Sequence, residues 1–202
     1  IGVRKGSERI VNKNIKPFND TSLLENKIKT LKEVENLDEI VVTTDCDKMF
    51  ALAEQLGVVA IKRPDYYTSN DCPGSENLEF IATQVDTDYI LYTPVTSPLV
   101  KSETYEDIIN IFKNLDEEYD SVVSMNYIKD FLWENGKPLN YDPLDCPRSQ
   151  DMESIFRMNF GACLLPRETM IKNKYIVGDS PFWYELPEAE GVDVDVPFDF
   201  NI

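Results

Sequence analysis

The chain has 202 residues, of which 37 are acidic and 20 basic, for a formal net charge of -17, and it contains no histidine. This length, with 42% hydrophobic residues, predicts a single domain over residues 1–202. The negative charge argues against a nucleic-acid partner, whose phosphates need many cations. The lack of histidine excludes Ser-His-Asp and Cys-His catalytic centres and every histidine-ligated metal site.

Hydropathy and cysteine usage bear on the compartment. No apolar run approaches the roughly 18 residues that a membrane-spanning helix needs, and no signal-peptide pattern opens the sequence, so no membrane partner is expected. The four cysteines are scattered without a CxxC pair, which favours free thiols and a cytoplasmic location.

Apolar β-rich runs alternate with amphipathic ones along the chain. After an opening strand that is cut short at Ile1, the pattern predicts helices over 23–34, 49–56, 75–85 and 103–115, and strands over 40–44, 58–61, 89–92 and 121–124. This alternation predicts an α/β fold with a mostly parallel sheet covered by helices. Ligands bind beyond the carboxyl ends of such strands, so loop 2–13, Asp45, Arg63 and Thr96–Ser97 are expected on one rim.

Residues 127–152, which we call the excursion, break this alternation with one tryptophan, one glycine and three prolines. A connection of about 25 unstructured residues inside a compact domain would be unusual. We therefore interpret the excursion as a lid or a subunit contact rather than as a plain surface loop.

The first sixteen residues hold five basic side chains and one acid, Glu8, in a chain that is otherwise strongly acidic. The basic residues are Arg4, Lys5, Arg9, Lys13 and Lys16. With Gly2 and Ser7, the loop has the backbone N–H groups, hydroxyl and cations of a phosphate cradle, although it matches neither a GxxxxGK[ST] loop nor a GxGxxG turn. The pattern predicts a binding site for a small anion.

Asp193 and Asp195 are expected on one face of a strand, because strand side chains alternate with a period of two. Two adjacent carboxylates repel each other unless a cation lies between them, and the oxygen ligands suit Mg²⁺ or Mn²⁺. Asp45 and Asp47 form a rival pair, for which we favour a helix-capping role because they directly follow a predicted strand.

Taken in order, these pieces resemble the CMP-sialic acid synthetase (acylneuraminate cytidylyltransferase) family over nearly the whole chain. The matching positions are Arg4, Ser7, Lys13 and Asn14 of the opening loop, then Thr43–Asp45, Arg63–Pro64, residues 71–75, Thr96–Leu99, Ser121–Ser124, Arg157–Ala162 and Asp193–Asp195. The chain departs from the family pattern at Glu8, Pro94 and Phe160. The Lys13–Asn14 pair is closer to the sialic-acid branch than to the Kdo branch.

The resemblance implies a three-layer, Rossmann-like nucleotidyltransferase fold and the activation of a nonulosonic acid, a sialic-acid-like 2-keto sugar acid, with CTP. It places the triphosphate against Arg4, Ser7, Arg9 and Lys13, the cytidine against Asn14, Arg63 and Ser75, Mg²⁺ on Asp193 and Asp195, and the sugar acid against Thr96, Ser97, Gln150, Arg157 and Asn159. Arg4, Lys13 and Asp195 are the implied catalytic residues. The family also implies a homodimer formed through the excursion.

Two alternatives stay open at this point. The chain could be a non-catalytic nucleotide- or sugar-binding regulator of the same fold, which the family departures at Glu8 and at the sugar positions motivate. It could also be a transferase that uses another nucleoside triphosphate or Kdo.

Overall fold

The computed structural model describes residues 1–7, 10–152 and 155–201. Within them, a four-stranded sheet has the order β10-β6-β9-β5, and β3 pairs with β4 in a second, two-stranded sheet. The strands are β3 (Val41–Thr44), β4 (Val59–Lys62), β5 (Tyr89–Tyr92), β6 (Ser121–Ile128), β9 (Ile155–Pro166) and β10 (Pro181–Glu185).

Most of these strands run in one direction. β3 is parallel to β4, and Gly2 extends this sheet through a parallel bridge to Thr43. β10 is parallel to β6, whereas β9 is antiparallel to both β6 and β5, so β5 and β6 point the same way. The sequence pattern predicted neither β9 nor β10, and β9 is the strand that makes this sheet mixed.

Four helices lie close to their predicted positions: α1 (Leu23–Lys32), α2 (Asp47–Gln55), α3 (Gly74–Thr83) and α4 (Ser102–Lys113). The sequence pattern did not predict α5 (Arg167–Asn173). The Ser22 hydroxyl caps α1 by accepting the Glu25 N–H. Pro73 precedes α3, and Ser75 lies in the first turn of the helix.

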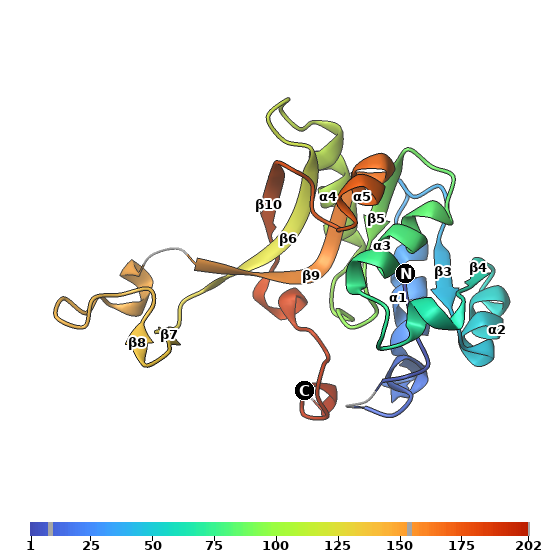
Figure 1. The fold of residues 1–202 in the computed structure, drawn as a ribbon, viewed down its shortest axis with the longest axis horizontal. Coiled ribbons are helices and arrows are strands. Elements are labelled where there is room, and N and C mark those ends of the chain that lie inside the picture. The colour runs from blue at the N-terminus through green and yellow to red at the C-terminus, as the bar shows by residue number, and fades with distance from the viewer. Residues whose placement is uncertain (8–9, 153–154, 202) are drawn as a thin grey trace.

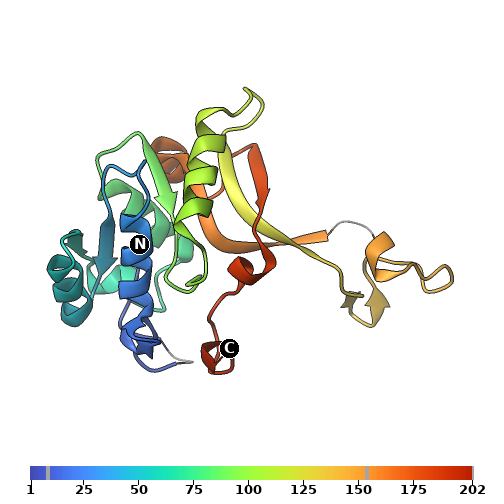
Figure 2. The same ribbon diagram turned by 180° about the vertical axis from the view of Figure 1, so that it is seen from behind.

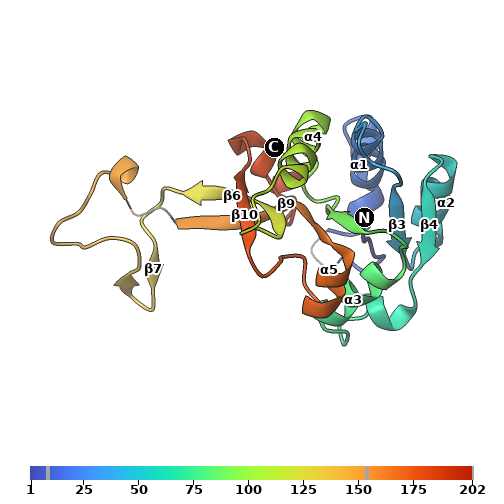
Figure 3. The same cartoon turned by 90° about the horizontal axis from the view of Figure 1, so that it is seen from above.

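Helices cover both faces of the four-stranded sheet. On one face, Val122 and Leu164 pack against side chains of α1 and α4. On the other, Val123 and Cys163 pack against α3 and α5. Figure 3 shows α1 and α4 above the strands and α3 and α5 below them. This arrangement confirms the predicted three-layer α/β fold.

The excursion projects away from these layers (Figure 1). β6 and β9 leave the sheet together as a two-stranded ribbon, and beyond it lie the short strands β7 (Trp133–Glu134) and β8 (Lys137–Pro138) and the 3₁₀ turn η3 (Ser149–Asp151). The same projection is seen from behind in Figure 2. No helix in the described part of the chain is long and apolar enough to cross a membrane.

Candidate functional site

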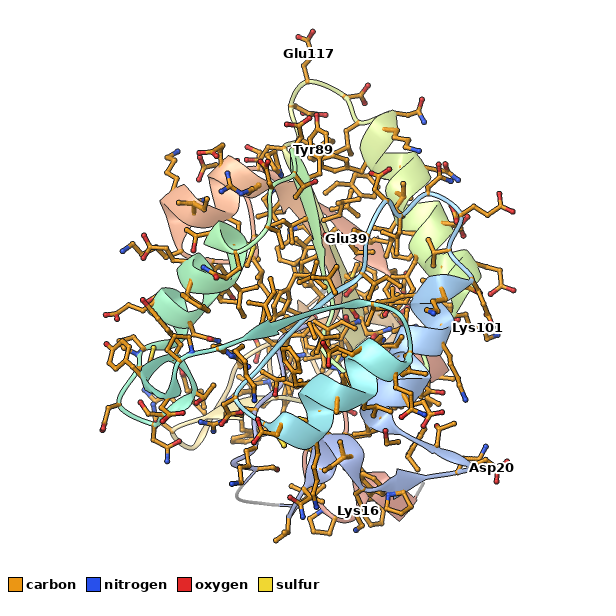
Figure 4. All side chains as sticks on the ribbon, turned by 90° about the vertical axis from the view of Figure 1, so that its right-hand side faces the viewer. Lys16, Asp20, Glu39, Tyr89, Lys101 and Glu117 are labelled. Atoms are coloured by element: carbon orange, nitrogen blue, oxygen red, sulfur yellow. The ribbon has the colours of Figure 1, made fainter. Side chains whose placement is uncertain are left out.

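The predicted site lies at the end of the domain where the opening loop approaches the C-terminal segment, as the contact of Lys13 with Val194 shows. Figure 4 shows Tyr89, where β5 begins, near Glu117 at one end of the domain, and Lys16 and Asp20 at the opposite end. Phe18 lies edge-on to Phe200, with ring centroids 5.8 Å apart. The basic loop and the C-terminal acidic segment are therefore neighbours on one rim. The strand pattern predicted the loop on this rim with Asp45, Arg63 and Thr96–Ser97, but it did not predict the acidic segment there.

Arg4 and Asn14 connect the opening loop to its surroundings. The Arg4 guanidinium Nη1 donates to the Thr68 carbonyl and to the Asn70 side-chain oxygen, both at 3.0 Å. The buried Asn14 amide donates to the Arg4 carbonyl at 3.1 Å. These contacts hold the basic loop against the polar loop before α3, which brings together two of the predicted nucleotide-binding segments.

Lys13 connects the opening loop to the acidic segment. It begins the 3₁₀ turn η1 (Lys13–Ile15), and its ammonium donates to the Val194 carbonyl at 2.8 Å and to Asp195 Oδ1 at 3.3 Å. The Lys13 side chain is 13% exposed and that of Asp195 is 44% exposed, so solvent reaches this contact from the side of Asp195. One predicted anion ligand and one predicted metal ligand thus share a contact across 182 residues of sequence.

Asp193 and Asp195 flank the buried Val194 and are themselves half-buried. The strand predicted here is wrong, because the segment is assigned to no strand, although the Val194 N–H donates to the Thr96 carbonyl at 2.7 Å. Burial, together with the charge of Asp195, raises the pKa of Asp193, and a hydrogen bond from Thr96 opposes that rise.

A hard cation fits this pair of carboxylates. Asp193 Oδ1 is buried without a hydrogen-bond partner among the described residues, and a bound cation would offset the energetic penalty on its charged form. No group of three or more His, Cys, Asp or Glu side chains is placed to hold a metal in the described ranges. Two carboxylates completed by substrate phosphates are a common ligand set for Mg²⁺.

Asp45 and Asp47, the rival acidic pair, do not act as helix caps. The residue before α2 is Cys46, without a side-chain cap, whereas Asp45 accepts the Lys5 N–H at 2.9 Å and so tethers the basic loop. Asp47 pairs with Lys62 at the surface. The capping interpretation is wrong, because the Asp45 carboxylate accepts a hydrogen bond from the opening loop and α2 begins after Cys46.

Arg63 lies behind the opening loop rather than at its surface. Its side chain is buried, Nη1 donates to Asn77 at 2.7 Å, and Nη2 donates to the Val3 and Thr43 carbonyls. Burial lowers the pKa of Arg63, although a guanidinium stays charged at any physiological pH. In this structure Arg63 supports the backbone from which the basic loop departs.

The remaining predicted nucleotide contacts are more exposed. Ser7 is half-buried in a turn in which its N–H donates to the Lys5 carbonyl, and Ser75 is exposed in the first turn of α3. Arg9 lies outside the described residues, as does Glu8.

The predicted sugar contacts form two groups. Thr96 and Arg157 contact the segment around Asp193: Thr96 contacts Val194 and Asp193, and the Arg157 guanidinium donates to the Gly191 carbonyl at 3.4 Å. Ser97 and Asn159 are buried beside them in the sequence. Gln150 does not join this group, because it lies in η3 of the excursion, beyond the ribbon of β6 and β9 (Figure 1).

Asn159 is engaged within the protein on both ends of its amide. The side-chain oxygen accepts the Ser124 hydroxyl at 2.5 Å and the Gly161 N–H at 3.1 Å, and the amide donates to Asn126 at 2.7 Å. These bonds surround Phe160, which has φ 58° and is 42% exposed. The residue that departs from the family pattern therefore forms a bulge in β9.

Sequence reasoning missed a buried cation, Lys27, which is 0% exposed on α1 and donates to the Ser97 carbonyl at 2.7 Å. The signal was visible in the sequence. Leu24, Ile28 and Leu31 define the apolar face of the helix, and Lys27 falls on that face by its spacing.

A cavity of about 780 Å³ lies elsewhere, between β3 and β5. Its described lining is mainly apolar and includes Ile1, Val41, Ile81 and Leu91, but none of the predicted site residues. The candidate site is therefore the open rim formed by the loops and not this cavity.

Comparisons with known proteins show the family and the fold of the chain. Residues 1–167 match the family model described as cytidylyltransferase. The chain is 24% identical to N-acylneuraminate cytidylyltransferase of Oncorhynchus mykiss, over 98% of this chain and 47% of that protein, and 24% identical to the Escherichia coli protein of the same name, over 100% and 50%. The chain spans about half the length of these two relatives. Post-translational flagellin modification protein B of Campylobacter coli is 22% identical, over 100% of this chain and 91% of that protein.

Solved structures share the fold at low identity. A structure described as CMP:2-keto-3-deoxy-manno-octonic acid synthetase complexed with CTP aligns with a TM-score of 0.67 and 14% identity, over 99% of this chain and 93% of the other. A 4-diphosphocytidyl-2C-methyl-D-erythritol synthase from Anaerococcus prevotii aligns with a TM-score of 0.72 and 11% identity, over 99% and 91%. With the family model matching most of its length, the chain belongs to the cytidylyltransferase family.

Proposed function

We propose that the protein transfers CMP from CTP to a nonulosonic acid, a sialic-acid-like 2-keto sugar acid, and releases pyrophosphate. The observation that carries the proposal is the contact between Lys13 and Asp195, because it joins a basic anion loop to an acidic cation site at one rim. The names of the relatives, N-acylneuraminate cytidylyltransferase, support the same chemistry.

In the proposed reaction, the C2 hydroxyl oxygen of the sugar acid attacks the α-phosphorus of CTP. A new oxygen–phosphorus bond forms, the bond from the α-phosphorus to the β-phosphate oxygen breaks, and the hydroxyl proton is released to solvent. Such transfers depend mainly on alignment and on stabilising charge at the phosphate oxygens, so they need no histidine.

The basic loop would supply the positive charge. Arg4 and Lys13 are held at opposite sides of the loop, by residues 68–70 and by the acidic segment. A triphosphate between them would meet two cations and the hydroxyl of Ser7. Both cations are anchored by hydrogen bonds in the free protein, so little reorganisation is needed on binding.

Asp193 and Asp195 would hold Mg²⁺ or Mn²⁺. A bound cation neutralises charge on the phosphate oxygens and lowers the pKa of a hydroxyl near it. In the free protein, the Lys13 ammonium pairs with Asp195 and so offsets part of the charge of that carboxylate.

On the acceptor side, Arg157 would contact the sugar carboxylate, since a guanidinium matches a carboxylate with two parallel hydrogen bonds. Thr96 contacts Asp193 and Val194, and Arg157 contacts the Gly191 carbonyl of the same segment. Asn159 is occupied by internal bonds, so it would support the acceptor site by holding the Phe160 bulge.

Pyrophosphate release tests this proposal. We would offer CTP, GTP, ATP and UTP in turn with N-acetylneuraminate, legionaminate, pseudaminate and Kdo, with and without Mg²⁺. We expect release with CTP and one nonulosonic acid, dependent on Mg²⁺. A preference for Kdo or for another nucleotide would change the assigned substrate. If the protein binds CTP but no pair of nucleotide and sugar acid releases pyrophosphate, the result would favour a regulator of the same fold.

We also propose that the excursion forms a homodimer contact. Its exposed side chains include large apolar ones, among them Phe131, Trp133 and Leu144, which together would form an apolar surface. Deleting residues 130–145 should convert a dimer to a monomer in multi-angle light scattering. An unchanged mass would contradict this role.

A further inference from the structure

Lys27 is an unusual residue for a protein core. It is 0% exposed on the buried face of α1, between Leu24 and Ile28, which are also 0% exposed. Lysine side chains are almost never fully buried unless their charge has partners. The rest of this face is apolar, so helix packing alone does not explain the ammonium group.

The partners of Lys27 belong to the loop that follows β5. The Lys27 ammonium donates to the Ser97 carbonyl at 2.7 Å, and the neighbouring Asn26 amide donates to the Pro98 carbonyl at 2.9 Å. The carbonyl before these two, on Thr96, accepts the Val194 N–H at 2.7 Å. Three consecutive carbonyls of loop 93–98 are thus held by donors from α1 and from the acidic segment.

A second set of bonds runs from Lys27 to the β9 bulge. The ammonium also donates to the Tyr105 hydroxyl, which is 2.8 Å from the Thr93 hydroxyl. Thr93 in turn donates to the Gly161 carbonyl at 2.9 Å. Gly161 directly follows Phe160, so the buried network connects α1 to both sides of the proposed acceptor site.

Three titratable groups face this ammonium. The buried Glu190 attracts it, the Tyr105 hydroxyl accepts from it, and the amino group of Ile1 repels it. Glu190 is itself bonded to the Lys101 N–H and the Thr104 hydroxyl. Burial lowers the pKa of Lys27 to about 7, and the charge of Glu190 limits that fall.

We propose that Lys27 is a positioning residue for the acceptor side of the site, where its ammonium holds loop 93–98 and the β9 bulge in the arrangement that the sugar acid requires. This inference rests on the proposed function. Lys27→Met would fill nearly the same volume, but it would leave the Ser97 carbonyl and the Tyr105 hydroxyl without this donor and would remove the cation that attracts the buried Glu190. The ammonium therefore contributes to the stability of the core as well as to the geometry of the loop, and the two contributions need separate measurements.

Lys27→Met tests the proposal, with Lys29→Met as the matched control. Lys29 lies on the same helix with a 54% exposed side chain, paired to Glu25. We expect Lys27→Met to lower kcat/KM for N-acetylneuraminate by about tenfold, since misplacement of an acceptor by a fraction of an ångström is costly. In Lys27→Met, the KM for CTP should change by less than about twofold. In Lys29→Met, every kinetic constant should stay within about twofold of the wild-type value.

The pH dependence separates positioning from simple stabilisation. The advantage of the wild type over Lys27→Met in kcat/KM for the sugar should shrink as pH rises from 6 to 8.5, because a neutral amine donates a weaker hydrogen bond than an ammonium. The free energy of unfolding should change in the opposite direction. Between pH of about 7 and the ordinary lysine pKa of 10.5, the unfolded chain binds more protons at Lys27 than the folded protein does. As pH rises through this range, the wild type therefore becomes more stable relative to Lys27→Met.

Hydrogen–deuterium exchange provides a readout that needs no turnover. Lys27→Met should speed amide exchange in residues 93–98 and 159–162 and leave α2 and β4 unchanged. If no sugar acid is a substrate for the wild type, the proposed function fails, while this measurement still decides the positioning role. Unchanged exchange in both segments, or an equal loss in CTP and sugar constants, would overturn the inference.

Discussion

The nucleotide side and the acceptor side of the proposed site are built in different ways. On the nucleotide side, Arg4 and Lys13 reach across the surface to carbonyl and carboxylate oxygens of distant segments. On the acceptor side, Asn159 and Ser97 are buried, Asn159 among neutral side chains and Ser97 against the Lys27 ammonium.

Because of this difference, substitutions on the nucleotide side should affect mainly binding, and substitutions on the acceptor side should also affect folding stability. A charged group at the rim can be removed with little loss of stability, because water can solvate the partners that it leaves. A buried amide cannot be removed so easily, since its former partners stay unsatisfied in a region without water. Substitutions on the two sides should therefore have different signatures, and the following experiments test that expectation.

Removing a carboxylate of the proposed metal pair should have the largest effect. Asp193→Asn and Asp195→Asn should each lower kcat/KM by about 100-fold or more, because the cation loses a charged ligand, with unchanged melting temperatures. Asp47→Asn, at the exposed rival pair, is the control and should keep full activity. Mg²⁺-dependent turnover near the wild-type rate in both variants would exclude the assignment.

Asn159→Ala should act on folding. It leaves the Ser124 hydroxyl, the Gly161 N–H and the Asn126 side-chain oxygen without their partner, so we expect a loss of about 3 kcal/mol in the free energy of unfolding. Urea denaturation measures it. Asn114→Ala, at an exposed helix end, should lose less than about 0.5 kcal/mol. A stable Asn159→Ala variant that only fails to bind sugar would remove the distinction between the two sides.

Lys13→Ala should weaken CTP binding by about 30-fold and CMP binding by less than about threefold, if its ammonium meets the outer phosphates with charge-assisted hydrogen bonds. Titration calorimetry with both nucleotides measures the two affinities. Lys48→Ala, an exposed lysine of α2, provides the control. Equal affinities of Lys13→Ala and the wild type for CTP would place this side chain outside the binding site.

Arg157→Lys should give the smallest of these effects. It keeps the charge but loses the planar fork, so we expect a rise in the sugar KM equivalent to about 1 to 2 kcal/mol with little change in CTP affinity. Steady-state kinetics with both substrates varied will show it. A selective fall in CTP affinity would move Arg157 to the nucleotide side.

Local patterns in the sequence predicted much of the fold. Strands 40–44 and 89–92 and the first four helices are visible as short apolar runs and 3.6-residue periods, and the structure places them within a few residues of the predicted bounds. β9 could not be found in this way. Its two halves are separated by the bulge at Phe160, with a register shift against β6, so no regular alternation of side chains runs through it.

The site was predictable in its residue types but not in its contacts. The basic loop and the acidic pair stand out in a chain without histidine, and the parallel strand pattern predicts the loop on the ligand-binding rim. It does not predict the acidic pair beside the loop, because that segment forms no strand. The pairing of Lys13 with Asp195 joins positions 182 residues apart, which no local pattern encodes. Arg63 and Asn159 were predicted as ligand contacts from family motifs, which do not report that both side chains are buried.

The ribbon of β6 and β9 also connects the excursion mechanically to Arg157 on the acceptor side of the site. Asn126 pairs with Arg157 in this ribbon, and Tyr127 pairs with Phe156 one step further out, toward the excursion. A paired ribbon resists bending within its plane far better than a single loop does. Any partner that fixes the tip of the excursion would therefore also limit the movement of the Arg157 guanidinium, so that assembly at a distant surface would stiffen the acceptor side of the site.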